Sequence, residues 1–266
     1  MRNKIKNIFI IFMCAMLPVA LAVSARAASD ASFNTVPLAK YSDKVYSESA
    51  SRFRILSGDS EFLFPETSTQ KIISKGRTNN IYSFLVLTGK YDEAAKQKPG
   101  PAADYLSGTI LLNTDDPEIT RLKYLFKNSG KIIEDVENYV YKFISNKIFG
   151  IPIISASEIL RNKSGDCTEH TVLAVTILRS LGVPARALVG MLLSKEFDGS
   201  RNVFVYHMWA EAFVNGRWVL VDAANPGTKY PNRYIALAYH HLKTEMPLSY
   251  LKAVSAMKSF SIEYAE

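Results

Sequence analysis

Apolar positions recur with a helical period between residues 115 and 143. A first helix would begin after Asp115 or Asp116 with Pro117 in its first turn, a position that proline tolerates well. Its apolar face would carry Ile119, Leu122, Leu125 and Phe126. The apolar face of a second helix would carry Ile132, Val136, Tyr139, Val140 and Phe143. Ser155 and Glu158 have the spacing of a capping box and predict the start of a short third helix.

A fourth helical segment, GDCTEHTVLAVTILRSLGVP at residues 165–184, is apolar on nearly every face. Asp166 would cap its start, with Glu169 three residues later, and Gly182 and Pro184 would end it. A helix that is apolar all round is typical of a protein core. The pattern therefore predicts a central buried helix with Cys167 in its first turn.

Strand-like segments follow this helix at residues 185–193, 203–214 and 217–223, and two earlier ones lie at 61–65 and 81–88. The dipeptide Asn215-Gly216 predicts a tight hairpin between the last two. Residues 96–104 look like an exposed loop or linker, and residues 28–60 show no clear pattern. We therefore expect an α+β fold in which a central helix packs on an antiparallel β-sheet. Residues 28–104 would form a smaller N-terminal region of uncertain fold, and residues 105–266 the main domain.

The first 27 residues have the layout of a secretory signal peptide. The basic segment MRNKIKN leads into an uncharged apolar run at residues 8–23, and Ala25 and Ala27 occupy the small-residue positions of a cleavage site. The run is short for a membrane span and Pro18 interrupts it, although an uncleaved anchor is the alternative. We expect export to the periplasm or the extracellular space, with no stable membrane span after cleavage.

Charge gives no indication of a nucleic-acid partner. Cleavage after Ala27 would remove four of the 32 basic residues and none of the 25 acidic ones, lowering the net charge from +7 to +3. No cluster of lysine and arginine with interleaved aromatic residues is present.

Removal of Cys14 with the signal peptide would leave Cys167 as the only cysteine. Exported proteins usually pair their cysteines, so a lone thiol is a buried inert side chain, an intermolecular bridge or a nucleophile. A two-residue hairpin turn places Trp209 opposite Asp222, and His207 then lies diagonally from Asp222 on the same face. Helix N-termini favour anions such as a thiolate. The thiol and the His–Asp pair are the groups needed for covalent catalysis at a carbonyl carbon.

The motifs GDCTEHTVLAVTILRSLGVPARALVG at 165–190 and YHMWAEAFVNGRWVLVDAA at 206–224 resemble the transglutaminase-like superfamily, which has a papain-like core. The resemblance extends over roughly residues 105–245 and leaves residues 28–104 uncovered. It implies that Cys167 is the nucleophile, His207 the general base and acid, and Asp222 the carboxylate that orients the histidine. It further implies a thioester intermediate on a protein or peptide substrate, here in the cell envelope, and no cofactor.

Several alternatives stay open at this stage. If the protein is an enzyme, hydrolysis of an amide is favoured over cross-linking because water is always abundant. The alternative to an enzyme is a binding or assembly module that keeps the three residues without turnover. Trp209 would wall the site, and Tyr141 and Asn146 are candidates for the side chain that supports the oxyanion. The histidines at 170, 207, 240 and 241 lack the spacing of a helical zinc site, so no metal is expected. We expect structural roles for Glu169, His170 and Glu211.

Overall fold

The computed structural model describes residues 35–266 apart from 59–61, 91–101, 151, 228–229 and 244–247. The predicted signal peptide and most of the predicted loop at 96–104 lie outside these described residues. Phe33–Glu266 form one compact unit, and the domain boundary proposed near residue 104 stays a prediction. Within the described part of the chain, no helix has the length and apolar character needed to cross a membrane.

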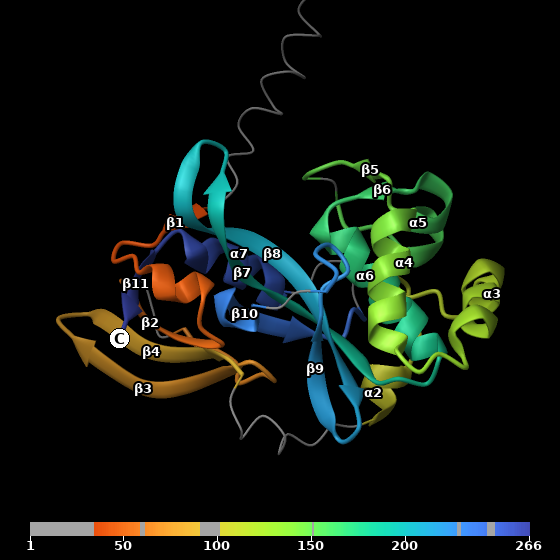
Figure 1. Ribbon diagram of the computed structural model, residues 1–266, viewed down its shortest axis with the longest axis horizontal. Helices are drawn as coiled ribbons and strands as arrows, with labels where there is room; N and C mark the ends of the chain where they lie inside the picture. The colour runs from red at the N-terminus through yellow and green to blue at the C-terminus, as the bar shows by residue number, and fades with distance from the viewer. Residues whose placement is uncertain (1–34, 59–61, 91–101, 151, 228–229, 244–247) are drawn as a thin grey trace, which may run out of the picture. The chain divides into compact units, whose positions relative to one another are not determined.

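The main sheet is antiparallel and is built around one long hairpin (Figure 1). Its strands run in the order β1 (Thr35–Pro37), β8 (Ser200–Val214), β7 (Ala185–Phe197) and β10 (Tyr234–His240), and β9 (Arg217–Val221) also pairs with β8. β1 pairs with residues 203–205 of β8, whereas β9 pairs with residues 210–214. His207 lies between these two paired stretches.

The predicted turn between β8 and β9 is confirmed. Asn215 and Gly216 both have positive φ, 54° and 77°, as a two-residue hairpin turn requires. Val214 pairs with Arg217 and Phe213 with Trp218, which is the predicted register. Asp222 directly follows the last residue of β9, the strand that pairs with β8.

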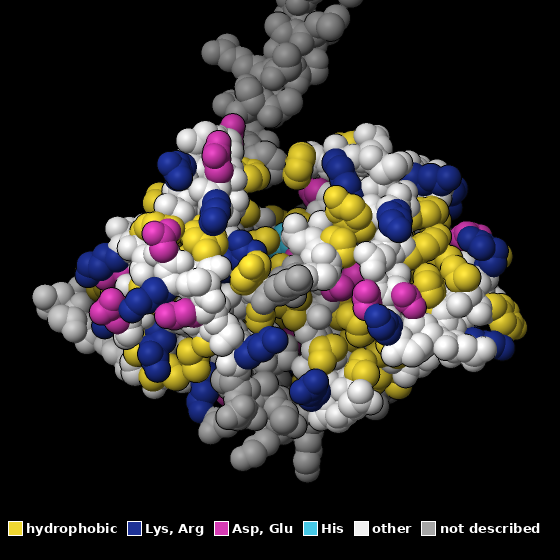
Figure 2. All heavy atoms as spheres, viewed as in Figure 1, with side chains coloured by type: hydrophobic (Ala, Val, Ile, Leu, Met, Phe, Trp, Pro, Cys, Tyr) yellow, Lys and Arg dark blue, Asp and Glu magenta, His cyan; other side chains and the backbone are white. Residues whose placement is uncertain are grey.

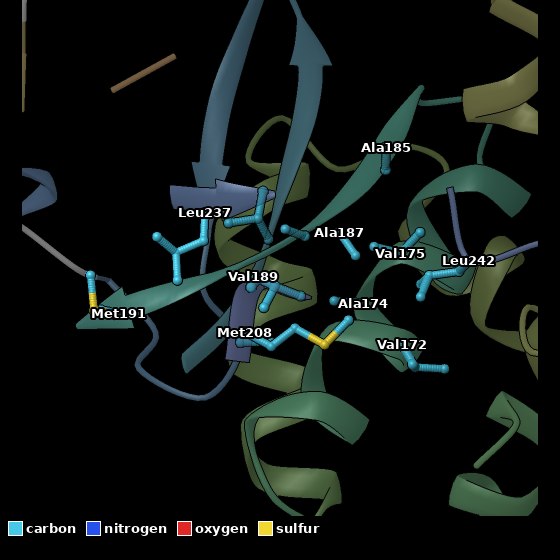
Figure 3. Packing of buried hydrophobic residues seen from close by; sticks show 14 of the residues in the cluster. Val172, Ala174, Val175, Ala185, Ala187, Val189, Met191, Met208, Leu237 and Leu242 are labelled. Carbon is cyan, nitrogen blue, oxygen red and sulfur yellow. The ribbon is translucent and has the colours of Figure 1, made fainter. Parts of the chain in front are cut away.

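The central helix α6 (Cys167–Ser180) is confirmed as a core element. Every residue from Thr168 to Arg179 is buried, and α6 packs against β7 and β8. Small and branched side chains of the helix, among them Ala174 and Val175, lie beside Ala187 and Val189 of β7 in the hydrophobic core (Figure 3). This packing fixes the start of α6 relative to the sheet, and with it the position of Cys167.

Three predicted helices surround α6 on its other faces. They are α3 (Pro117–Phe126), α4 (Ile132–Phe143) and α5 (Ala156–Asn162), capped as expected by Asp116 and Ser155 at the starts of α3 and α5. Leu125 was expected on the buried face of α3, but its side chain is 60% exposed, because Ile119, Leu122 and Phe126 fill the contact with α6. Short elements complete this side: α2 (Ala102–Leu106), β5 (Asn146–Lys147) and β6 (Ser164–Gly165).

A second antiparallel sheet joins the two ends of the described chain. Its order is β11 (Phe260–Ala265), β2 (Ala50–Ser57), β4 (Ile81–Gly89) and β3 (Gln70–Thr78), and α7 (Leu248–Met257) precedes β11. The strand expected at 81–88 is confirmed by β4. The strand expected at 61–65 is wrong, because residues 62–66 form no strand. Phe62 and Phe64 there instead pack their rings against Phe260.

Candidate active site

Cys167 is the first residue of α6, as predicted, and its thiol is free. Asp166 caps the helix by accepting the N–H of Thr168 at 2.9 Å, and Glu169 accepts the N–H of Asp166 at 3.0 Å. Gly165 has φ +154°, and a Cβ there would lie 2.4 Å from Cβ of Glu169, so the capping box requires glycine at this position. The cap holds Cys167 where the unbonded N–H groups of a helix start are concentrated.

His207 brings its ring from β8 to the thiol. Its Nε2 lies 2.7 Å from Oδ2 of Asp222, so Nδ1 is the ring nitrogen that is left for Cys167. Burial disfavours the charged imidazolium, but the Asp222 carboxylate and a hydrogen bond with the Cys167 thiol outweigh burial and raise the pKa of His207. The structure thus places His207 against Asp222, and His207 lines one cavity together with Cys167.

Asp222 is fully buried and is surrounded by donors. Oδ2 accepts hydrogen bonds from the Tyr234 hydroxyl at 2.7 Å and from Nδ2 of Asn225 at 3.1 Å, in addition to His207. Oδ1 accepts the main-chain N–H groups of Ala224 and Asn225 at 3.0 and 3.1 Å. Burial alone would raise the pKa of Asp222, but His207, Tyr234 and Asn225 hold it well below its usual range. The carboxylate is thus ionised and fixed in direction.

Glu137 holds the loop that carries Asp222. Its Oε1 accepts the main-chain N–H of Asp222 at 2.7 Å, and its Oε2 accepts the N–H of Gly227 at 3.3 Å. Burial of Glu137 raises its pKa to about 7, although these two hydrogen bonds act in the opposite direction. Glu137 on α4 therefore links the helical side of the protein to the loop after β9.

A cavity of about 510 Å³ opens beside the thiol. Cys167 and His207 line it together with Asp166, His170 and Tyr206, and further lining residues come from β5, the end of β7 and the segment after β9. Figure 2 shows a hollow on this face of the molecule, with a histidine side chain visible inside it. The Cys167 side chain is half-buried at this opening. Among the described residues, no group of three histidine, cysteine or acidic side chains is placed to hold a metal ion.

Residues 126–223 match the family model of the transglutaminase-like superfamily. This part of the chain is therefore similar to that superfamily. The match includes Cys167, His207 and Asp222 and covers less than half of the chain. No curated protein matches the chain in sequence.

Three solved structures align with this chain at low identity. A candidate cysteine protease from Cytophaga hutchinsonii aligns at 16% identity and a TM-score of 0.47, covering 86% of this chain and 82% of that one. The periplasmic domain of TgpA from Pseudomonas aeruginosa aligns at 12% identity and a TM-score of 0.47, covering 66% of this chain and 72% of that one. Red sea bream transglutaminase aligns at 10% identity and a TM-score of 0.35, covering 84% and 53%.

The other residues expected to support the site take different positions. Trp209 is buried and stacks on His207 with 6.1 Å between ring centroids, so it backs the imidazole and does not line the cavity. Tyr141 and Asn146 are exposed and also lie outside the cavity lining, whereas their neighbour Lys147 is part of it. The oxyanion role suggested for Tyr141 and Asn146 stays a prediction, with no contact to the cavity in its favour.

Three acidic or histidine side chains of the core have the expected structural contacts. Glu211 forms a buried ion pair with Arg186 at 2.6 Å, and Glu169 completes the helix cap. His170 is buried, with Nδ1 at 2.5 Å from the carbonyl oxygen of Asp166.

Sequence reasoning missed Glu137, Asn225, Tyr234 and Lys147 as parts of the site. For Asn225 a signal exists, because it follows Asp222 by three residues in a turn. For the other three the sequence holds no local signal, since they reach the site only through packing of distant elements.

Proposed function

We propose that the protein is a cysteine hydrolase that cleaves amide bonds of a protein or peptide in the cell envelope, through a thioester intermediate on Cys167. One observation supports this more than any other: the thiol at the start of α6 and the His207 ring line the same cavity, and Nε2 of His207 lies 2.7 Å from a buried, ionised Asp222. The signal-peptide pattern of the first 27 residues supports action outside the cytoplasm.

The chemistry follows from the geometry of the three side chains. His207 accepts the proton of the thiol, and the Cys167 sulfur forms a bond to the amide carbonyl carbon. As the tetrahedral intermediate collapses, the C–N bond breaks and His207 returns the proton to the leaving amine. His207 then takes a proton from water, whose oxygen attacks the thioester, and the acid product and the thiol are released. Asp222 keeps Nε2 of His207 protonated throughout, which leaves Nδ1 for proton transfer.

Hydrolysis is the proposed outcome because water enters an open cavity at high concentration, whereas transfer to an amine requires a second bound substrate. Amine transfer uses the same acyl-enzyme, so the two outcomes differ only in which nucleophile arrives second.

The proposal is tested by the reactivity of the thiol. We expect iodoacetamide to label Cys167 near pH 6, and His207→Ala to slow this labelling at least about tenfold, because the imidazolium that pairs with a thiolate is lost. His241→Ala is the matched control, since His241 lies outside the cavity lining and should leave the rate unchanged. Labelling that needs pH 8.5 or above and does not respond to His207→Ala would indicate a binding or assembly module without turnover.

A second measurement separates hydrolysis from transfer. The protein is incubated with a peptide library and a biotinylated amine, with Cys167→Ser as the control. We expect cleaved or deamidated peptides that depend on Cys167 and little amine incorporation. Incorporation of the amine as the main Cys167-dependent product would contradict the hydrolase assignment.

A further inference from the structure

Positive side chains from two parts of the fold line the cavity beside Cys167. Lys147 comes from β5 and pairs with Gly165 just before α6. Lys195 comes from the end of β7, and Arg233 ends η3 (Pro231–Arg233) directly before β10, so both belong to the part of the lining that the main sheet provides. Among the described lining residues the one carboxylate is Asp166, and its two oxygens accept main-chain N–H groups, Oδ1 that of Thr168 and Oδ2 that of Gly150. The cavity therefore carries an excess of positive charge.

Lys195 and Arg233 are held by aromatic rings and not by carboxylates. The ammonium of Lys195 lies 4.8 Å from the centre of the Tyr46 ring, and the guanidinium of Arg233 lies 5.6 Å from the same ring and 4.9 Å from that of Tyr230. Neither forms an ion pair with a described residue, and Nε of Arg233 is buried without a hydrogen-bond partner. Both cations keep their charge available to a ligand.

Lys147 is held by a neutral partner. Its Nζ lies 2.5 Å from Nε2 of His170 and 4.8 Å from the centre of the Tyr141 ring. Burial lowers the pKa of His170 to about 4, so at neutral pH its Nε2 accepts a proton donor and carries no charge of its own. Two N–H groups of the Lys147 ammonium are thereby left for a further acceptor.

We propose that the cavity binds an acidic peptide, with carboxylates on both sides of the amide bond that Cys167 attacks. One carboxylate lies against Lys147, and another against the pair Lys195 and Arg233. This inference rests on the proposed function, since it names the substrate class of the same site.

The apolar part of the lining favours a peptide over a sulfated or phosphorylated polymer. Leu192, Phe197 and Val205 also lie in the lining, on β7, which carries Lys195, and on its partner strand β8. A peptide presents apolar side chains and carboxylates in turn, whereas a polyanionic glycan presents charge along its whole length. The mixed lining therefore matches acidic residues within an otherwise ordinary peptide.

A pair of alkylating reagents measures the charge preference without knowledge of the substrate. The rate constant of Cys167 with anionic iodoacetate is divided by its rate constant with neutral iodoacetamide. This ratio is then divided by the same ratio measured for the free thiol N-acetylcysteinamide. For the wild-type protein at low salt we expect a normalised ratio above one that falls towards one as salt screens the cations. We expect Lys147→Gln, Lys195→Gln and Arg233→Gln each to lower the ratio by about two- to fivefold.

Lys123→Gln is the matched control, because Lys123 is an exposed cation on α3 outside the cavity and should leave the ratio unchanged. Lys195 is exposed, so its substitution should leave folding intact. A normalised ratio of one in the wild-type protein overturns the proposal, and so does a ratio that none of the three cavity substitutions changes. Either result leaves the test of His207 and thiol reactivity unaffected, so the two proposals fail separately.

Protection of the thiol tests the class of ligand. Acetylated and amidated penta-glutamate should slow iodoacetamide labelling of the wild-type protein at least about threefold more than penta-glutamine of the same length, and the difference should disappear in Lys147→Gln and Lys195→Gln. Equal protection by the two peptides contradicts the proposal. Protection by a heparin tetrasaccharide without protection by penta-glutamate contradicts it too, because the site would then bind a polyanionic glycan.

Discussion

At the scale of single residues, the site depends on how far hydrogen bonds offset the cost of burying each carboxylate's charge. Asp222 has five donors around its two oxygens, which offset the cost of burying its charge. Glu137 receives two N–H groups, and its pKa is raised to about 7 by burial. The first carboxylate is stable as an anion, whereas the second becomes ionised at a cost as pH rises towards neutral.

Glu137→Gln should therefore change how stability depends on pH. In the folded protein Glu137 holds its proton between pH 4.5 and about 7, where the unfolded chain has released it, so ionisation destabilises the wild-type fold as pH rises through that window. Glutamine removes this dependence. Relative to wild type, the free energy of unfolding of the variant should rise by up to about 3 kcal/mol from pH 4.5 to 7.5, measured by urea unfolding.

Asn138→Ala is the control for this series, because Asn138 is exposed on the same helix and carries no titratable group. Its difference from wild type should stay nearly constant across the same pH range. A constant difference for Glu137→Gln as well would contradict the raised pKa of Glu137.

The placement of the three candidate catalytic residues could be predicted from the sequence because local rules apply to them. Helix capping placed Cys167, and hairpin register placed His207 beside Asp222. Tyr234 and Glu137 could not be predicted, because their hydrogen bonds to Asp222 join residues 12 and 85 positions apart. Contacts of that kind depend on how whole elements pack, which no spacing rule encodes.

At the scale of elements, the close approach of β7, β8 and β10 sets the position of His207. Gly190 of β7 pairs with His207 of β8 on one side and with Ala236 of β10 on the other. A Cβ at Gly190 would lie 2.1 Å from the carbonyl oxygen of Ile235 and 2.7 Å from Cη2 of Trp209. The absence of a side chain here allows Trp209 to stack behind the imidazole.

Gly190→Ala should therefore disturb both the sheet and the site. The added methyl group must displace the backbone of β10 or the Trp209 ring, and overpacking of this kind costs about 1–3 kcal/mol. We expect a lower thermal midpoint and slower alkylation of Cys167 at pH 6, because the His207 ring loses its support. Gly76→Ala provides the comparison, since nothing lies within 4 Å of a Cβ at that exposed strand position. Equal effects of the two substitutions would rule out this role for Gly190.

The elements that were predicted correctly share strong periodicity or clear capping. α3, α6 and the β8–β9 hairpin have both hydrophobic pattern and end signals. β1 and β2, between residues 35 and 57, were not predicted. β1 pairs with a strand about 170 residues further along the chain, and β2 lies between β4 and β11, of which β11 is about 200 residues further along. The segment at 61–65 has strand-like composition for another reason, namely aromatic packing in the core.

At the scale of the whole molecule, the two sheets share one hydrophobic core. Ile262 of β11 is fully buried and pairs with Ile55 of β2, and its carbonyl oxygen accepts the N–H of Ala39, just after β1. This residue connects the second sheet to the strand that borders β8. We therefore expect a substitution that removes packing at Ile262 to destabilise the part of the protein that holds Cys167 as well.

Ile262→Ala should lower the stability of the molecule as one unit. Removing a buried isoleucine side chain costs about 2–5 kcal/mol, which corresponds to a fall of roughly 4–20 °C in the thermal midpoint. Circular dichroism and protection of Cys167 from alkylation should report the same single transition. Ser261→Ala, an exposed neighbour on β11, should leave the midpoint nearly unchanged. Two separate transitions in Ile262→Ala would show that the sheets unfold independently.

The pairing of β1 with β8 and of β2 with β11 also bears on the order in which the protein can assemble. These first strands leave the ribosome long before their partners exist, and the last partner, β11, ends at Ala265. Closing such distant pairs carries a large entropic cost, which is typical of slow folding. The main sheet cannot be completed until β10 has been synthesised, nor the second sheet until β11 has been, and during that interval the early strands present open edges of the kind that chaperones cover.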